Sequence, residues 1–269
     1  MVMVLIFSIN ANDTDGSTFR AIYSFTPDNF TIYGSLIISN GVLYGMSGGG
    51  GTNSAGTIFS INTDGTNFRT VYSFGGTDGT SPYGSLTISN GVLYGMTTRG
   101  GVNGEFGTIF SINANDTDGT SFRVIHSFDG TDGSLSNGAL LISGSVIYGL
   151  ANQGGANSVG TIFSINTDGT GFTKFYDFDG ANGSYPNGSL TISNNVLYGM
   201  TMSGGTAGAG TIFSINTDGT GFTKLYDFSD ANGTYPMGSF IISNNILYGM
   251  TNTTNVDYSG YGVIFSYQP

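Results

Sequence analysis

Cysteine and tryptophan are both absent from this chain of 269 residues, and histidine occurs once. Without cysteine the chain has no disulfide, no thiolate nucleophile and no cysteine-ligated zinc. Lysine and arginine together number six, against 17 aspartate and glutamate residues, for a formal net charge of −11. Phosphate backbones and anionic lipids are bound by clustered basic side chains, so we expect neither as a partner.

Long apolar runs are missing as well, because no stretch reaches the roughly 18 residues that a membrane span needs. We therefore expect no membrane insertion. The opening segment, Met1 to Phe7, is hydrophobic but has no basic region, which favours a strand over a signal peptide. Charged residues make up 9% of the chain, whereas glycine occurs 46 times and tyrosine and phenylalanine 16 and 20 times. This composition is typical of short strands joined by tight turns.

The chain does contain a repeat of about 50 residues, which indicates a repeat architecture. An Ile-Phe-Ser triplet occurs six times, with its central residue at Phe7, Phe59, Phe110, Phe163, Phe213 and Phe265. Each repeat holds four short apolar segments separated by turn residues. In the fourth copy these segments, termed strands A to D, are 188–193, 196–201, 211–216 and 222–228. Four antiparallel strands per repeat of this length predict one blade of a β-propeller.

We therefore predict one all-β domain over residues 1–269, a five-bladed β-propeller of four-stranded antiparallel blades. The predicted repeats run roughly over 1–56, 57–107, 108–160, 161–210 and 211–262, with a closing strand at 263–269. Large apolar residues recur on strand B, and we expect them to pack between blades. They are Tyr44, Tyr94, Tyr148, Tyr198 and Tyr248, each followed two residues later by Met46, Met96, Leu150, Met200 or Met250.

The number of strands leaves the closure of the ring uneven. Five A, five B and five D strands accompany six C strands, so one C strand is surplus. We predict that the last blade mixes the termini, with strands A and B from 239–251 and strand D, with C, from 3–25. The residues expected in closure or in joining chains are Leu5, Phe7, Ile264 and Phe265, on the two terminal C strands.

Catalytic residues are not evident in the sequence. His126 replaces a tyrosine of the repeat on strand D, and a single histidine cannot form a multi-histidine metal site. Glu105 is the only glutamate and lies near Arg99, which would favour its ionised form rather than the protonated acid that glycoside hydrolysis needs. We therefore expect no enzyme, with polysaccharide hydrolysis the least favoured function.

No cofactor is expected, although two loops place carboxylates where Ca²⁺ could bind. They carry Asp13 and Asp15 in one loop and Asp116 and Asp118 in the other, each followed by glycine. Alternating oxygen ligands before a glycine suit a hard cation, but the loops are shorter than an EF-hand and end without glutamate. A solvated hairpin extension is the simpler interpretation. A basic residue also begins each strand D, at Arg20, Arg69, Arg123, Lys174 and Lys224, where charge guards an edge strand against pairing.

The loops before strand A and between strands B and C form the predicted binding face, since both meet at one end of a propeller. Exposed tyrosine and asparagine suit sugars, whose C–H faces stack on aromatic rings while their hydroxyls bond to amides. The candidate ligand-binding residues are Tyr33, Tyr83, Asn137, Tyr185, Asn187 and Tyr235. Because the blades are nearly identical, we expect repeated weak sites.

Several motifs of the second copy resemble a known family. They are Pro82-Tyr83-Gly84, Leu93-Tyr94-Gly95-Met96-Thr97, Gly100-Gly101 and Gly107-Thr108-Ile109-Phe110. This pattern resembles the Gloeobacter/Verrucomicrobia-type tandem repeat of choice-of-anchor proteins, and it covers the whole chain. The resemblance implies an exported or surface-displayed bacterial protein with no assigned catalytic residues. Members often end in a sorting or anchoring tail, which is not visible in this chain.

Together these observations predict a non-catalytic, extracellular or cell-surface propeller that acts as a binding or interaction module. A glycan is the favoured ligand class. The alternative is a structural protein that assembles into a fibre, lattice or surface layer through its terminal strands or blade faces. That alternative makes a homo-oligomer or polymer the expected partner.

Overall fold

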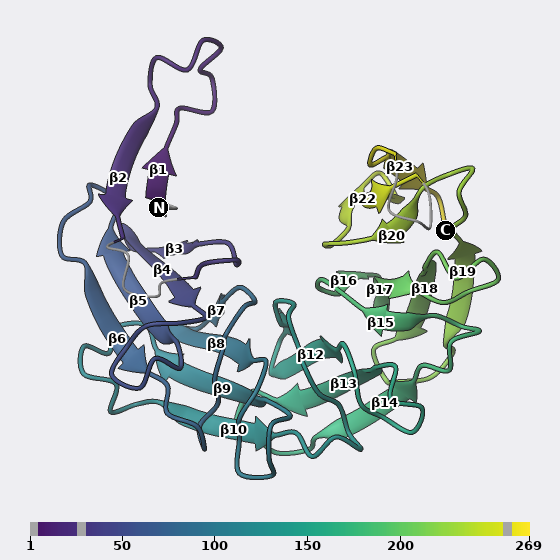
Figure 1. Cartoon of the computed structure of the whole chain (residues 1–269), viewed down its shortest axis with the longest axis horizontal. Coiled ribbons are helices and arrows are strands. Elements are labelled where there is room, and N and C mark those ends of the chain that lie inside the picture. The colour runs from purple at the N-terminus through teal and green to yellow at the C-terminus, as the bar shows by residue number, and fades with distance from the viewer. Residues whose placement is uncertain (1–4, 26–30, 255–259) are drawn as a thin grey trace.

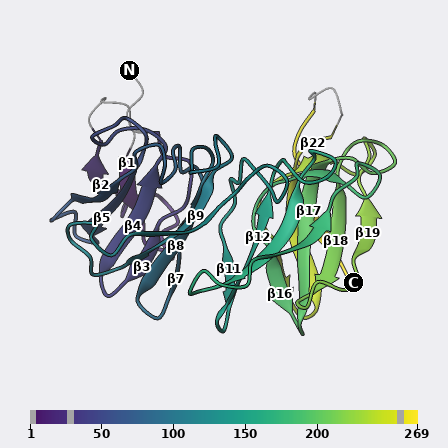
Figure 2. The ribbon, with the colours of Figure 1, turned by 90° about the horizontal axis from the view of Figure 1, so that it is seen from below.

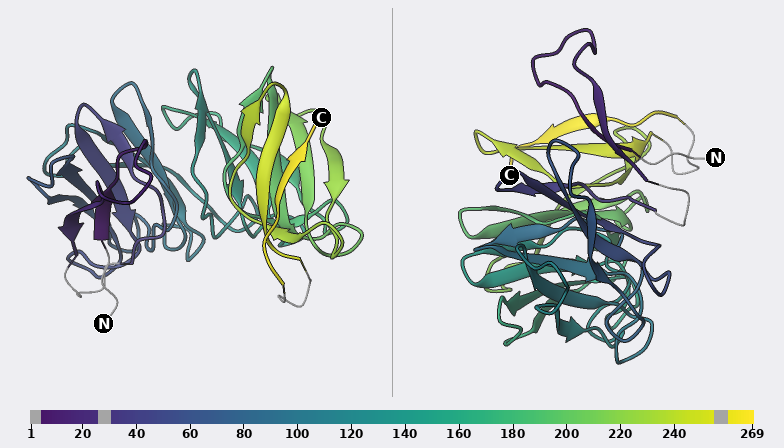
Figure 3. Two further views of the ribbon diagram at one scale, coloured as in Figure 1. Left: turned by 90° about the horizontal axis from the view of Figure 1, so that it is seen from above. Right: turned by 90° about the vertical axis from the view of Figure 1, so that its left-hand side faces the viewer.

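The computed structural model describes residues 5–25, 31–254 and 260–269, and the strand pairs in these ranges are all antiparallel. Consecutive sheets lie side by side around an arc, with the N-terminal strands at one end and the C-terminal strands at the other (Figure 1). Views from the side show the strands of each sheet running through the thickness of this arc (Figures 2 and 3). In the described ranges, no helix is long and apolar enough to cross a membrane.

Four sheets contain four consecutive strands each, in the order that the repeat predicts, and we number them blades 1 to 4. Blade 1 consists of β3 (Ile37–Ser39), β4 (Val42–Ser47), β5 (Thr57–Asn62) and β6 (Arg69–Ser73). Blade 2 consists of β7 (Thr87–Ser89), β8 (Val92–Thr97), β9 (Thr108–Asn113) and β10 (Arg123–Ser127). Blade 3 consists of β11 (Leu141–Ser143), β12 (Val146–Ala151), β13 (Thr161–Asn166) and β14 (Thr173–Asp177). Blade 4 consists of β16 (Thr191–Ser193), β17 (Val196–Ser203), β18 (Thr211–Asn216) and β19 (Thr223–Asp227).

Two further sheets hold fewer strands of the repeat. Blade 5 consists of strands A, B and C, which are β21 (Ile241–Ser243), β22 (Ile246–Thr253) and β23 (Ile264–Tyr267). The N-terminal hairpin consists of strands C and D, which are β1 (Leu5–Ser8) and β2 (Arg20–Ser24). Two short strands, β15 (Ser184–Pro186) and β20 (Thr234–Pro236), extend the sheets of blades 4 and 5 by pairing with β17 and β22.

The predicted mixing of the termini in one blade is not confirmed. Among the described strands, β1 pairs with β2 alone, while β23, which carries Ile264 and Phe265, pairs with β22. Neither terminal C strand is therefore a surplus strand within a complete blade. Each belongs to a sheet that lacks at least one strand of the repeat. The sheet of β1 contains only strands C and D, and the described sheet of β23 contains strands A, B and C. An all-β, propeller-like arrangement is what the structure shows.

The core lies between neighbouring sheets, because each blade is apolar on both faces. We call the face toward the next blade along the chain the forward face and the opposite one the rear face. Between blades 3 and 4, Tyr148, Leu150 and Ile162 of the forward face form one buried cluster with the rear face of blade 4. The rear-face members of this cluster are Leu190, Leu197, Phe213 and Ile215. The predicted packing of the strand B tyrosines and methionines between blades is confirmed for blades 1 to 4. It is wrong for blade 5, where Tyr248 and Met250 are exposed.

Aromatic pairs tie each strand D to the following blade. Tyr176 stacks on Phe222 of the next repeat, with ring centroids 3.6 Å apart and planes inclined by 5°. Phe178 meets Phe213 edge-on at 5.2 Å, and Phe213 is fully buried. Such pairs contribute about 0.5–1.5 kcal/mol beyond the burial of their area. His126 occupies the tyrosine position in blade 2 and stacks on Phe172 at 3.8 Å in the same way.

The strand C phenylalanine offers a matched test of this packing. Phe110 is fully buried between blades 1 and 2, whereas Phe7 at the same position of the N-terminal hairpin is 57% exposed. We expect Phe110→Ala to lower the free energy of unfolding by about 3–5 kcal/mol, since it opens a cavity in a closed interface. Phe7→Ala should cost about 0.5 kcal/mol or less. Urea unfolding followed by circular dichroism at low protein concentration measures both, and equal losses would contradict the interface.

Candidate functional site

Glycine residues form the inner end of the arc, at the start of each strand A. A Cβ added to Gly34 would lie 2.1 Å from the carbonyl oxygen of Gly84, and one on Gly138 would lie 1.8 Å from that of Gly188. Gly84 and Gly188 approach the equivalent glycine of the next repeat about as closely. Only residues without a side chain allow the backbones of successive blades to approach to this distance. The residue before each glycine is consequently brought beside its counterparts from the other blades.

A row of serine hydroxyls fastens the same inner ends together. The hydroxyl of Ser85 accepts a hydrogen bond from the backbone N–H of Ser35 at 2.8 Å. The hydroxyl of Ser189 accepts one from Ala139 at 2.9 Å, and that of Ser239 one from Ser189 at 3.0 Å. These bonds link blades about one repeat apart in sequence. This row was not predicted from the sequence, although a serine directly after the glycine recurs in four of five repeats and is a signal for it.

The residues before the glycines line one cavity of about 560 Å³. They are Tyr33, Tyr83, Asn137, Asn187 and Met237, one from each of five successive repeats. Four of them are ligand-binding residues predicted from the sequence, where near-identical repeats suggest separate sites rather than one shared cavity. The repeat places equivalent residues at equivalent radii, and the glycine contacts bring those positions together around a common centre.

The chemistry of the lining differs along the arc. At one side, the rings of Tyr33 and Tyr83 meet edge-on with centroids 5.1 Å apart, and Tyr33 is 71% exposed. Tyr83 is held by Gly48, where an added Cβ would lie 2.1 Å from the ring. The Oδ1 atom of Asn137 accepts a hydrogen bond from the Thr98 hydroxyl at 3.0 Å, which directs its amide N–H groups elsewhere. None of the five lining residues is charged, so the cavity suits a neutral polar ligand.

The structure does not bring Tyr185 and Tyr235 to this cavity. Both have positive φ, 55° in each case, and each is the middle residue of a short strand, β15 or β20, between the two residues that pair with the neighbouring strand. Their backbone N–H groups donate to the carbonyls of Val159 and Ala209 at 2.8 Å, and Tyr235 is only 9% exposed. These two tyrosines therefore shape the connection between blades instead of lining the cavity. Their distance from the glycine in sequence, three residues rather than one, is the signal that separates them.

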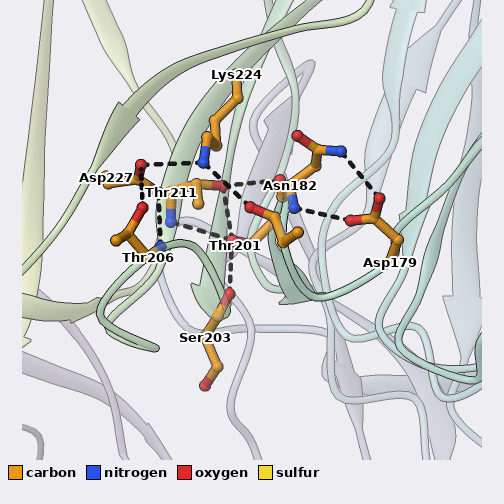
Figure 4. A network of polar contacts seen from close by, with 9 residues as sticks. Asp179, Asn182, Thr201, Ser203, Thr206, Thr211, Lys224 and Asp227 are labelled. Carbon is orange, nitrogen blue, oxygen red and sulfur yellow. Dashed lines mark hydrogen bonds and ion pairs between the residues drawn. The ribbon is translucent and has the colours of Figure 1, made fainter.

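A polar network supports the loop that carries Asn187 (Figure 4). Nζ of Lys224 donates to the carbonyl of Ala181 at 3.1 Å and pairs with a carboxylate oxygen of Asp227 at 3.0 Å. In the same loop, the backbone N–H of Asn182 donates to Asp179 at 2.7 Å. Lys224 thus clamps the preceding connection to its own blade, and Lys174 does the same to Thr131 in the blade before. These contacts give two of the basic residues a role beyond the predicted protection of edges.

Two buried threonines complete the network beneath the loop. The hydroxyls of Thr201 and Thr211 lie 2.9 Å apart on neighbouring strands, and the Thr211 hydroxyl also reaches the carbonyl of Asn182 at 3.3 Å. The pair Thr97 and Thr108 repeats this contact in blade 2. The recurring threonines therefore hold the connection to strand A in place, which positions the cavity lining above it.

The carboxylates considered for Ca²⁺ have partners within the protein. Oδ1 of Asp116 accepts hydrogen bonds from the backbone N–H groups of Asp118 at 3.0 Å and Gly119 at 2.9 Å. Its Oδ2 accepts from both the N–H and the hydroxyl of Ser121. Asp13 makes the corresponding contacts with Asp15, Gly16 and Thr18. Among the described residues, no group of three or more His, Asp or Glu side chains could hold a metal ion.

Hydrogen bonding lowers the pKa values of these turn aspartates. The Thr18 side chain and backbone hold the pKa of Asp13 well below its usual range. Burial raises the pKa of Asp116, but hydrogen bonds from Ser121 and Asp118 outweigh it and keep the pKa low. Both groups therefore remain ionised at neutral pH as acceptors that fix their hairpins.

The residues weighed for catalysis are engaged in structural contacts. Nε2 of His126 lies 2.7 Å from Oδ2 of Asp132, which matches the contact between Tyr72 and Asp78 in the preceding repeat. Glu105 accepts a hydrogen bond from the backbone N–H of Gly100 at 3.2 Å. Neither residue lines the cavity described above.

The glycine contacts predict a site-selective loss of stability. Gly138→Ala should lower the free energy of unfolding by about 1–3 kcal/mol, because its Cβ would overlap a backbone oxygen that cannot rotate away. Gly144→Asn is the control, since Gly144 has φ of 62°, has open space around it, and is replaced by asparagine in other repeats. Asparagine tolerates this conformation, so its cost should stay within about 0.5 kcal/mol. Chemical denaturation compares the two, and a harmless Gly138→Ala would refute the close approach.

The depressed pKa of Asp116 predicts a pH-dependent contribution to stability. Asp116→Asn should destabilise the protein by about 1 kcal/mol at pH 7, where the wild-type carboxylate accepts four hydrogen bonds. A lowered folded-state pKa gives stability that is present above the unfolded pKa near 3.8 and is lost as the pH falls through the folded value. The difference between wild type and variant should therefore shrink below about pH 4. Urea unfolding from pH 7 to pH 2.5 measures this gap, and a gap that widens in acid would contradict the assignment.

Comparisons with known proteins agree with the repeat and the fold. The chain matches the Gloeobacter/Verrucomicrobia repeat over residues 4–140 and again over 116–269. No curated protein sequence matches it significantly. Among solved structures it is similar to a chain in the crystal structure of a nidogen/laminin complex, with a TM-score of 0.57 and 15% identity over 98% of this chain and 89% of that chain.

A second similar structure is TolB from Acinetobacter baumannii, with a TM-score of 0.53 and 11% identity. The match covers 89% of this chain and 52% of that chain, so the present chain spans about half the length of TolB. Identities this low show a shared fold and nothing of function. The repeat match, in contrast, extends over nearly every residue, and the chain belongs to the Gloeobacter/Verrucomicrobia repeat family.

Proposed function

We propose that this protein is a non-catalytic binding module that takes a neutral glycan in the cavity at the inner ends of the blades. The observation that carries the proposal is the lining itself, which combines two tyrosine rings with two asparagine side chains and no charge. Sugars present C–H faces to aromatic rings and hydroxyls to amides, and both surfaces are offered here.

The two asparagines supply the polar half of such a site. In the described part of the chain, the side chain of Asn187 makes no hydrogen bond within the protein, and Asn137 uses only its oxygen. An amide carries two donors and an acceptor, so these groups can bond to ligand hydroxyls without first breaking an internal contact. Binding therefore avoids the cost of leaving a buried protein partner unpaired.

Because the five repeats share one cavity, we expect one binding site per chain. Each repeat contributes one side chain to a shared volume, so the five repeats differ in chemistry at the position where they meet. A rigid surrounding scaffold with variable side chains at its centre is the usual arrangement of a binding site on a repeat fold. Display outside the cell, which the family resemblance implies, would give this module access to polysaccharides.

Titration with neutral oligosaccharides tests the proposal directly. We expect binding with a stoichiometry of one, and Tyr33→Ala or Tyr83→Ala should each weaken it about fivefold, because each removes about 1 kcal/mol of stacking. Isothermal calorimetry and ligand-observed NMR measure the affinity. No turnover should accompany binding, and release of reducing sugar would favour the hydrolase instead.

Tyr185→Asn serves as the matched control. Tyr185 lies on the same connection as Asn187, two residues before it, but does not line the cavity, and asparagine tolerates its positive φ. Its affinity should equal that of the wild type. If Tyr33→Ala and Tyr83→Ala bind as tightly as this control, the cavity is not the glycan site.

A further inference from the structure

The forward face of blade 5 exposes large apolar residues whose counterparts in the other blades are buried, except for Tyr198 of blade 4, which is half-buried. Tyr248 is 40% exposed, whereas Tyr44, Tyr94 and Tyr148 at the same position are 3–6% exposed. Met250 is 59% exposed, against 1–4% for Met46, Met96, Leu150 and Met200. Ile264 is 80% exposed, against 0–4% for Ile6, Ile58, Ile109, Ile162 and Ile212. The strand register places Met250 opposite Ile264 and Tyr248 opposite Ile241, so all four side chains share this face.

The rear face of the N-terminal hairpin shows the complementary exposure. Phe7 is 57% exposed, while Phe59, Phe110, Phe163 and Phe213 are fully buried. Ile9 is 49% exposed, while Ile61, Ile112, Ile165 and Ile215 are at most 1% exposed. Phe19 lies beside Phe7 with ring centroids 5.4 Å apart and is 52% exposed. The forward side of the same hairpin is normal, because Ile6 is buried against Phe59 and Ile61 of blade 1.

These two faces match each other as the two sides of one blade interface. Inside the chain, forward-face Tyr, Met and Ile pack against rear-face Phe and Ile between blades 1 and 2 and between blades 2 and 3, and Leu150 replaces the methionine between blades 3 and 4. Blade 5 offers the first set and the N-terminal hairpin the second, at opposite ends of the arc (Figures 1 and 3). We propose that the forward face of blade 5 in one copy packs against the rear face of the N-terminal hairpin in a second copy of this chain.

The interior interfaces argue for a second copy as the partner. The side chains and the strand geometry required of the partner are those that this chain itself presents. No charged side chain is among the exposed residues that make up the two faces. Association through them would be apolar and would not bring acidic side chains together. Contiguous exposed apolar residues on one face mark an interaction site.

The interaction is head to tail, so it leaves one free face at each end of a dimer. Interfaces of this heterologous kind continue into closed rings or open filaments. Each added chain would carry its own cavity, which converts a single weak site into a multivalent array. The assembly proposal does not depend on what the cavity binds.

Two surface variants and their mixture test the proposal. We expect the wild type to exceed the 27.9 kDa chain mass increasingly with concentration, in light scattering coupled to size-exclusion chromatography and in sedimentation velocity. Ile264→Lys and Phe7→Lys should each weaken self-association at least tenfold, because each ruins one of the two faces. Mixed in equal amounts, they should form a dimer that grows no further, since each variant retains the face that the other has lost.

Val102→Lys is the control, since Val102 is 73% exposed but lies on neither face, and it should assemble as the wild type does. Circular dichroism and thermal unfolding of each variant establish that the fold is retained, which exposure of the substituted positions favours. A wild type that stays monomeric at all concentrations would overturn the proposal. So would single variants that still assemble, or a mixture that contains only one variant in its dimers.

Discussion

The fold depends on the stacking of sheets, because no single blade can bury its own apolar faces. Each blade is apolar on both faces, so a buried ring such as Phe110 needs a neighbouring sheet to exclude water from it. Strand B carries a glycine opposite this ring, and a Cβ added to Gly95 would lie 2.5 Å from Phe110. The phenylalanine, the glycine and the preceding blade's aromatic residues thus form one unit. Repetition of that unit stacks the sheets into an arc and brings their inner ends together.

At the inner ends of the blades, equivalent positions of five repeats line one cavity with different side chains. Hydrogen bonds and backbone contacts between blades require glycine and serine there, and these residues vary little. The residue before the glycine is free of that requirement and varies as Tyr, Tyr, Asn, Asn and Met. Five positions that are separated by about 50 residues consequently meet at one cavity. The chemical differences between repeats at the cavity therefore fall on this position.

Local hydrogen bonds account for the ionised aspartates of the turns, and the lack of a further blade accounts for the exposed faces at the two ends of the arc. Aspartates in the turns use their carboxylate oxygens to fix local backbone, as Asp116 does, which leaves them ionised and accounts for part of the net charge of −11. At the ends of the arc the stacking stops, and side chains that are buried elsewhere face solvent. Exposed Ile264 and exposed Phe7 occupy the two positions that pack against each other at the interfaces within the chain.

The strands, their order and most of the packing positions are predictable from the sequence, because a two-residue side-chain alternation and a 50-residue period are local properties of the chain. The repeat also indicates Tyr33, Tyr83, Asn137 and Asn187, since each precedes the glycine that starts strand A. Contacts between blades, which are visible only in the folded chain, bring these four residues to one cavity and leave Tyr185 and Tyr235 outside it. The pairing of β1 with β2 and of β23 with β22 is likewise visible only in the folded chain. The reason is that strand pairing and the curvature of stacked sheets depend on contacts between distant repeats, and near-identical repeats do not specify in sequence which copies meet.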